Sequence, residues 1–104
     1  MSPVFPRDQI EKALTQKGFT MTQGDHRFYR LMVGGKETSI RTKISMGSGY
    51  KEYGVSLLSS MKHQLKLTMS KLKDLIECPL SKEEYADFLK KNGHIRVNET
   101  EENF

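Results

Sequence analysis

Three histidines and one cysteine are the side chains of this 104-residue chain with the strongest potential for acid–base, nucleophilic or metal chemistry. His26 stands in the most suggestive context, because it follows Gly24-Asp25 and opens a run in which basic and aromatic residues are mixed. An imidazole titrates near neutral pH, so it can take a proton from an RNA 2′-hydroxyl or give one to a leaving oxygen. His26 is therefore the candidate catalytic residue, with a turn histidine of no special role as the alternative.

The other members of this group are expected to be inert. His63 falls on the solvent side of an expected helix, and His94 lies in a segment that lacks periodicity. Cys78 is expected to be a small buried hydrophobic residue, and a lone cysteine forms no intramolecular disulfide, which favours a reducing, cytoplasmic location. The four side chains show no metal-ligand spacing, so the sequence predicts neither a metal site nor a small-molecule cofactor.

The charge distribution points to an anionic partner. The chain has 17 Lys and Arg against 13 Asp and Glu, a formal net charge of +4. Between residues 26 and 73 ten basic residues stand against two acidic ones, Glu37 and Glu52. Such a local excess is typical of proteins that bind a nucleic acid backbone, with a merely soluble basic surface as the alternative. No apolar run is long enough to span a membrane, and the first residues do not resemble a signal peptide.

The sequence predicts a helix followed by three strands. A helix beginning near Arg7 would bury Ile10, Ala13 and Leu14 as one stripe, with Lys17 in its last turn and Gly18 as its left-handed cap. Alternating residues then predict strands over 19–23, 26–33 and 36–44. Gly24-Asp25 and Gly34-Gly35 read as two-residue turns between them.

Three further helices are expected after a glycine-rich loop over residues 45–54. The first runs from about Val55 to Leu65. The second is capped by Thr68 and ends by Cys78, before Pro79. The last is opened by a capping box of Ser81 and Glu84 and closes at Asn92-Gly93. The fold class is therefore α+β, an α-β-β-β-α core with a three-stranded antiparallel sheet, two further C-terminal helices, and helices on one sheet face. Residues 1–96 are expected to form one domain, and 97–104 a disordered acidic tail.

The second hairpin allows a prediction of which side chains share a face. A two-residue loop at Gly34-Gly35 places Arg30 opposite Ser39, Phe28 opposite Arg41 and His26 opposite Lys43. The opposite face is expected to be the core face, with Arg27 at its rim, and it comprises Tyr29, Leu31, Val33, Thr38, Ile40 and Thr42. The first face is then cationic, with one aromatic side chain in it and His26 at its end.

This arrangement supplies the candidate nucleic-acid-binding residues. Arg41 and Lys43 could stabilise charge on a phosphate beside His26. Tyr50 and Lys51, at the end of the glycine-rich loop, are further candidate contacts, because glycine lets backbone N–H groups approach a phosphate closely. The loop is not a Walker motif, and a flexible connection is the alternative interpretation. Lys62 and Lys66 add to the same basic excess, with a solvated helix face as the alternative. The full predicted set is Arg27, Phe28, Arg30, Arg41, Lys43, Tyr50, Lys51, Lys62 and Lys66.

Several short motifs resemble the HicA-type toxins of toxin–antitoxin systems. They are Lys17-Gly18-Phe19, Gly24-Asp25-His26, the strand ending at Ile44, and Lys51-Glu52-Tyr53-Gly54 leading into Leu57-Leu58. The segment 64–68, Gln-Leu-Lys-Leu-Thr, is similar to the end of the family's second helix and its following cap. The resemblance covers about residues 7–78.

The resemblance implies a fold like the double-stranded-RNA-binding domain and metal-independent cleavage of mRNA in which His26 is essential. It also implies a HicB-like antitoxin protein that covers the site. Two features depart from the family pattern: Gly-Asp-His stands where Gly-Ser-His is usual, and Met46-Gly47 stand where a second histidine is often found. The sequence therefore leaves three hypotheses: a HicA-like ribonuclease, a non-catalytic RNA-binding module of the same fold, and a protein-interaction domain.

Overall fold

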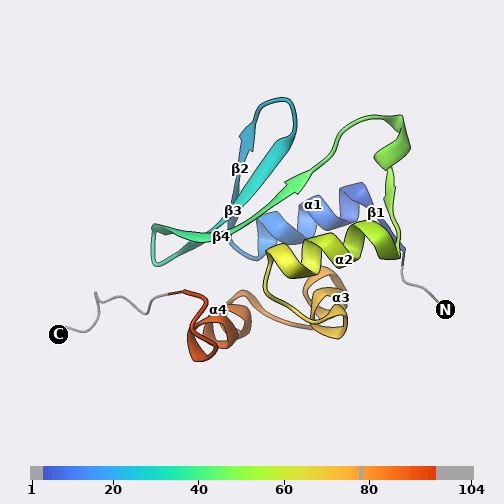
Figure 1. The fold of residues 1–104 in the computed structure, drawn as a ribbon. Coiled ribbons are helices and arrows are strands. Elements are labelled where there is room, and N and C mark those ends of the chain that lie inside the picture. The colour runs from blue at the N-terminus through green and yellow to red at the C-terminus, as the bar shows by residue number, and fades with distance from the viewer. Residues whose placement is uncertain (1–3, 78, 96–104) are drawn as a thin grey trace.

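The computed structural model describes residues 4–77 and 79–95, which form helices and strands in an α+β arrangement (Figure 1). The order is β1 (Phe5–Pro6), α1 (Arg7–Gln16), β2 (Phe19–Gln23), β3 (Arg27–Val33), β4 (Lys36–Ile44), a 3₁₀ turn (Ser48–Tyr50), β5 (Glu52–Tyr53), α2 (Val55–Gln64), α3 (Met69–Glu77) and α4 (Lys82–Lys91). The expected α+β class and three-stranded antiparallel sheet are confirmed.

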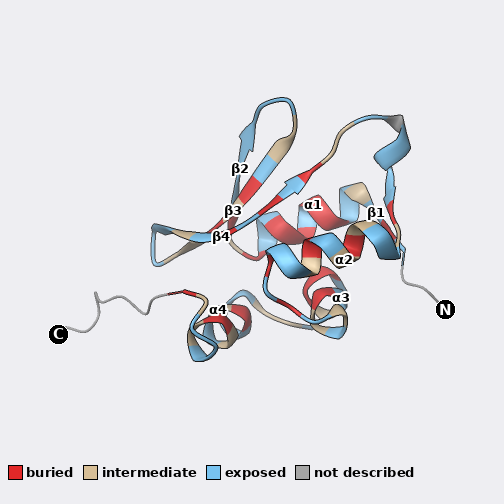
Figure 2. Cartoon of the chain, in the orientation of Figure 1, coloured by how far each residue is buried: buried red, intermediate tan, exposed pale blue. Residues whose placement is uncertain are grey.

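The sheet has the order β2-β3-β4, and the helices lie on one side of it (Figure 1). α1 packs against β2 and α3, while α2 packs against β4 and α3. Of the six side chains expected on the core face, Tyr29, Leu31, Ile40 and Thr42 are buried, while Val33 and Thr38 are partly buried. Red segments in Figure 2 mark this buried layer between sheet and helices. None of the helices in the described ranges has the length and apolarity required to cross a membrane.

The end of α1 forms as its sequence indicates. Ile10, Ala13 and Leu14 are buried, and Gly18 follows the helix with φ +97°, a conformation that costs glycine little. The Gly18 carbonyl then accepts from the Met32 backbone N–H at 3.0 Å, which starts the pairing of β2 with β3. Lys17 differs from expectation: it is buried, and its ammonium donates to the Leu80 carbonyl at 2.6 Å.

α4 is tied to the rest of the core by Tyr85. The Tyr85 ring stacks on Phe19 with 6.2 Å between centroids, and its hydroxyl donates to the Leu65 carbonyl at 2.8 Å. The predicted capping box is present, with Ser81 and Glu84 bonding reciprocally at 2.9 and 3.0 Å. These contacts join the last helix to the core of the domain.

The N-terminal segment and the glycine-rich loop are held together by specific contacts, so the loop is not merely a flexible connection. Phe5 is buried and pairs with Tyr53, so that β1 and β5 form a small second sheet. Arg7 donates from Nη1 to the carbonyls of Ser45 and Gly47, at 3.3 and 3.2 Å. The Tyr53 hydroxyl accepts from the Ser45 N–H at 2.9 Å. The loop over residues 45–54 is therefore braced at both ends.

The expected register of β3 and β4 is wrong beyond the first two pairs. Val33 pairs with Lys36 as expected, but an irregularity between Arg30 and Met32 shifts the remaining pairs by two residues. Arg30 consequently lies opposite Arg41, and Phe28 opposite Lys43. A shift of two residues keeps every side chain on its expected face, because side chains alternate with a period of two.

The first turn also differs from expectation. Gln23 pairs with Arg27, so the turn comprises three residues, Gly24, Asp25 and His26, and β3 begins after the histidine. His26 therefore pairs with no residue of β4. The interpretations of Cys78 and of the tail over 97–104 lie outside the described residues.

Candidate nucleic-acid interface

The side of the sheet away from the helices, here called the outer face, carries the cationic and aromatic side chains of interest. It is built from β2, β3 and β4 by alternation and comprises Thr20, Thr22, Phe28, Arg30, Met32, Glu37, Ser39, Arg41 and Lys43. No helix of the described residues covers this side, and the exposed residues of β2 and β4 are pale blue in Figure 2. The outer face is thus open to a partner.

Two cross-strand rows organise the outer face. In the first row Phe28 stands between Thr22 and Lys43, and in the second Arg30 stands between Thr20 and Arg41. Like charges directly opposite each other destabilise a sheet, so the Arg30–Arg41 pair is costly unless an anion lies between them. The rows place an aromatic ring beside a concentrated positive charge.

The cations of the outer face form no ion pair with the acidic residues that the structure describes. Arg30 donates from Nη1 to the Thr38 carbonyl at 2.8 Å, which holds its guanidinium along the sheet. Among the described residues the only ion pair joins Arg27 to Glu11, so the charges of Arg41 and Lys43 are not neutralised by a nearby carboxylate. Arg41 and Lys43 are exposed, as binding to a phosphate backbone would require.

Phe28 and His26 form the end of this face nearest the first turn. The Phe28 side chain is 43% exposed, so its ring is accessible to a partner. The His26 ring meets it edge-on, with 6.4 Å between centroids and an interplanar angle of 88°. A base stacked on Phe28 would therefore bring its sugar and phosphate close to an imidazole.

Within the turn, a hydrogen bond fixes the backbone of His26, but none fixes its side chain among the described residues. The Gly24 N–H donates to the His26 carbonyl at 2.9 Å, which closes the turn. His26 is half-buried, and its Nδ1 is buried without a hydrogen-bond partner among the described residues. Asp25 is exposed and makes no ion pair with any described residue. No side chain of the described chain thus selects the imidazole tautomer.

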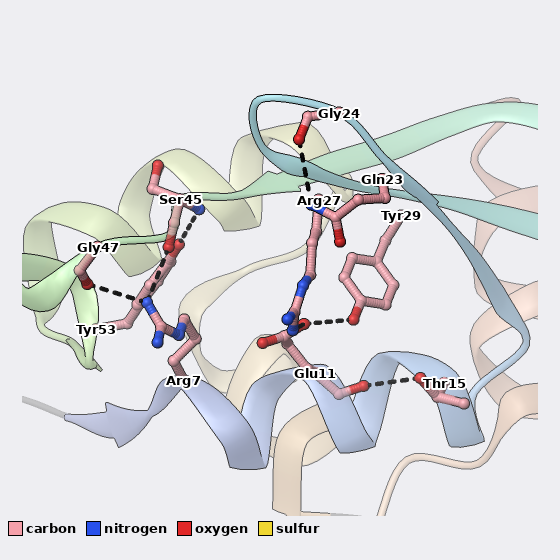
Figure 3. A network of polar contacts seen from close by, with 10 residues as sticks. All are labelled: Arg7, Glu11, Thr15, Gln23, Gly24, Arg27, Tyr29, Ser45, Gly47 and Tyr53. Atoms are coloured by element: carbon pink, nitrogen blue, oxygen red, sulfur yellow. Dashed lines mark hydrogen bonds and ion pairs between the residues drawn. The ribbon is translucent and has the colours of Figure 1, made fainter.

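Arg27 is directed to the other side of the sheet. Figure 3 shows its guanidinium and the Tyr29 hydroxyl both pointing toward the carboxylate of Glu11 on α1. Glu11 Oε1 accepts from Arg27 Nη1 at 2.7 Å and from the Tyr29 hydroxyl at 2.6 Å. The hydrogen bond that Arg27 donates to Glu11 raises the pKa of Arg27. Burial, followed by the hydrogen bond that Tyr29 donates to Glu11, raises the pKa of Tyr29 well above its usual range. We call these three residues the inner network.

Tyr50 and Lys51 project from the braced loop. Tyr50 is 40% exposed and Lys51 is exposed, whereas the Lys51 carbonyl accepts from the Arg7 N–H at 2.8 Å. In Figure 3 the Arg7 guanidinium reaches the carbonyls of Ser45 and Gly47, which shows how α1 supports this loop. The two side chains are therefore presented by a fixed backbone.

Lys62 and Lys66 lie at the C-terminal end of α2, on the helical side of the sheet, and do not join the outer face. The N–H groups of Lys66 and Leu67 bond to the carbonyls of His63 and Lys62, at 3.3 and 2.8 Å, which is a Schellman motif. Lys66 occupies the left-handed position with φ 63°, where glycine is usual. Lys66 is exposed there, so the motif displays its charge.

Sequence reasoning missed Glu11, Thr20 and Thr22. The threonines could have been found by extending the alternation to β2, which places them on the face of Phe28 and Arg30. Glu11 had no local signal, because its partners are 16 and 18 residues away. Among the described residues no group of three or more His, Cys, Asp or Glu could hold a metal ion. Comparisons of the chain with protein-family models, with curated proteins and with solved structures found no match.

Proposed function

We propose that this chain is an RNA-binding protein that uses the outer face of its sheet. The observation that carries the proposal is the Arg30–Arg41 pair: two cations stand opposite each other beside an exposed aromatic ring, with no acidic partner in the described part of the chain. Arginine and lysine bind phosphates, and an exposed ring accepts an unpaired base by stacking. In its finer form the fold is proposed to be like that of the double-stranded-RNA-binding domain, with a HicA-like activity.

The proposed chemistry is cleavage of mRNA with His26 as the general base. The imidazole takes the proton of a 2′-hydroxyl, the freed oxygen attacks the adjacent phosphorus, and the bond from phosphorus to the 5′-oxygen breaks. The leaving oxygen receives a proton from the imidazolium or from water. Lys43 stands in the row of Phe28 and Arg41 in the next row, where their charges would stabilise the phosphate as it gains charge.

A non-catalytic RNA-binding module is the second candidate. It is favoured by the His26 side chain, whose Nδ1 has no partner among the described residues, since a general base is usually oriented by a second group. The neighbouring Asp25 carboxylate is also exposed, and it would repel a phosphate at this end of the face.

A protein partner is proposed for the same face. A HicB-like antitoxin would present acidic side chains to Arg30, Arg41 and Lys43, and would cover Phe28 and His26. Charge complementarity of this kind speeds association and fixes orientation. The third hypothesis explains the same charges differently: the chain is a protein-interaction domain whose basic face binds only such an acidic partner.

One experiment separates these readings. Induced expression of wild type and of His26→Ala, with RNA decay followed in the cell, tests cleavage, and Phe28→Ala tests the face itself. We expect wild type to arrest growth and degrade mRNA, His26→Ala to bind RNA without degrading it, and Phe28→Ala to bind weakly. If wild type leaves RNA intact but binds it, the protein is a module without catalysis. If it binds no RNA at low salt, the proposal of RNA binding is wrong.

A further inference from the structure

The free edge of β2 differs from the edges that most single domains present to solvent. Within the described residues, β2 is hydrogen-bonded only to β3, and the side chains from Thr20 to Gln23 are exposed. The sequence Phe19–Gln23 contains no charge and no proline. Natural edge strands usually carry charges, prolines or bulges that prevent another strand from pairing with them. The edge of β2 has none of these protections.

The opposite edge of the same sheet is protected. β4 carries four charged side chains within nine residues, and its pairing with β3 is broken by an irregularity near Met32. Two β4 strands brought together would therefore place charges in close proximity on a distorted edge. The two edges of the sheet therefore differ: the edge of β4 is protected against pairing with another strand, and the edge of β2 is not.

The backbone of β2 has hydrogen-bonding groups directed outward. The Gly24 N–H donates to the His26 carbonyl and the Gly18 carbonyl accepts from the Met32 N–H, so even-numbered residues of this segment face β3. Residues of an antiparallel strand alternate in the direction of their N–H and C=O groups. The backbone groups of Phe19, Met21 and Gln23 therefore point toward the free edge.

We propose that two copies of this chain associate through β2, antiparallel, with Met21 opposite Met21 of the second copy. This pairing joins the two three-stranded sheets into one continuous sheet and satisfies the outward backbone groups of both strands. The inference goes beyond RNA binding and does not depend on it.

A second copy fits this edge because the strand is complementary to itself. About Met21 as the centre, Thr20 lies opposite Thr22 of the second copy, and threonine pairs across strands are favourable. The two Met21 side chains, each 43% exposed in the single chain, lie on the same side of the joined sheet and cover each other. No charged side chain of either strand meets another, since Phe19–Gln23 has none.

The test combines sedimentation equilibrium over a concentration series with amide hydrogen exchange of the intact chain. We expect the wild-type mass to rise from 12.0 kDa toward twice that value. Over the same series the Met21 and Gln23 amides should become protected. Met21→Lys should remain a monomer, because it puts two like charges at the centre of the pairing. Ser39→Lys adds the same charge on exposed β4 and should dimerise as wild type does.

Met21→Pro is the second variant. It removes an N–H that β3 does not use, so the single chain should keep its fold, which amide spectra would verify, yet fail to dimerise. Two results would overturn the proposal: a wild-type monomer with unprotected Met21 and Gln23 amides at every concentration, or a dimer that both Met21 variants preserve.

Discussion

The two faces of the β2-β3-β4 sheet use the same residue types in opposite ways. On the helix-facing side, Arg27 is held by Glu11, and the same carboxylate accepts from Tyr29. On the outer face, Arg41 and Lys43 have no acidic partner among the described residues, and Phe28 lies exposed beside Lys43. Consecutive residues of β3 thus point to opposite faces. A cation has an acidic partner on the helix-facing side, and the cations of the outer face have none among the described residues.

Replacing Glu11 should have the largest effect of these variants, and that effect should be on the stability of the fold. Glu11→Ala leaves the buried Tyr29 hydroxyl without its acceptor, which we expect to lower the free energy of unfolding by about 3 kcal/mol. Urea denaturation measures this change. Arg41→Ala, the matched variant on the outer face, should change stability by no more than about 0.5 kcal/mol. Equal losses in the two variants would remove the distinction between the faces.

Loss of the Phe28 ring should act on RNA binding instead. Phe28→Ala removes a stacking surface, and we expect affinity for single-stranded RNA to fall by about 2 kcal/mol, or about 30-fold. Fluorescence anisotropy with a labelled oligonucleotide measures the affinity. Phe28→Tyr keeps a ring and should retain most of it. An unchanged affinity in Phe28→Ala would exclude base stacking at this position.

The salt dependence should distinguish Arg27 from the cations of the outer face. Lys43→Gln should reduce the slope of log affinity against log salt by about 1, because one phosphate contact is lost. Arg27→Gln should leave the slope unchanged, since its guanidinium is paired with Glu11 on the other side. If Arg27→Gln reduced the slope as much as Lys43→Gln, Arg27 would belong to the binding surface after all.

Alkaline pH should weaken the inner network. Burial raises the pKa of Tyr29 above its ordinary value of 10.0, so its contribution to stability is complete below that pH and is lost as the pH rises further. Tyr29→Phe should cost about 1 kcal/mol at neutral pH and make the alkaline loss of stability shallower. The remaining loss should come from Tyr85, whose pKa burial also raises. An unchanged alkaline slope in Tyr29→Phe would contradict this role of the network.

Local signals predicted most of the fold. The stripe of α1 with Gly18, the capping box of α4 and the alternation of β3 and β4 each act within a few residues, and each is confirmed. β1 and β5 were missed because strands of two residues are too short for a period to be visible. The register of β3 and β4 was predicted wrongly because the irregularity near Met32 shifts the pairs by two residues, which does not change the alternation of inward and outward side chains.

The candidate site could be predicted only in part for a related reason. Alternation placed Phe28, Arg30, Arg41 and Lys43 on one face, and the register error did not alter that result. It also placed Arg27 on the opposite side, but it could not indicate that Arg27 would be neutralised. The ion pair with Glu11 depends on how α1 packs under the sheet, which no local pattern of the sequence encodes.

The most direct test of RNA binding by the outer face is an amide NMR titration of the wild-type protein with single-stranded RNA at low salt. If the outer face binds RNA, the largest shifts should fall on Thr22, Phe28, Arg41 and Lys43, and they should diminish as salt is added. Shifts confined to α3 and α4, or no shifts at all, would contradict it.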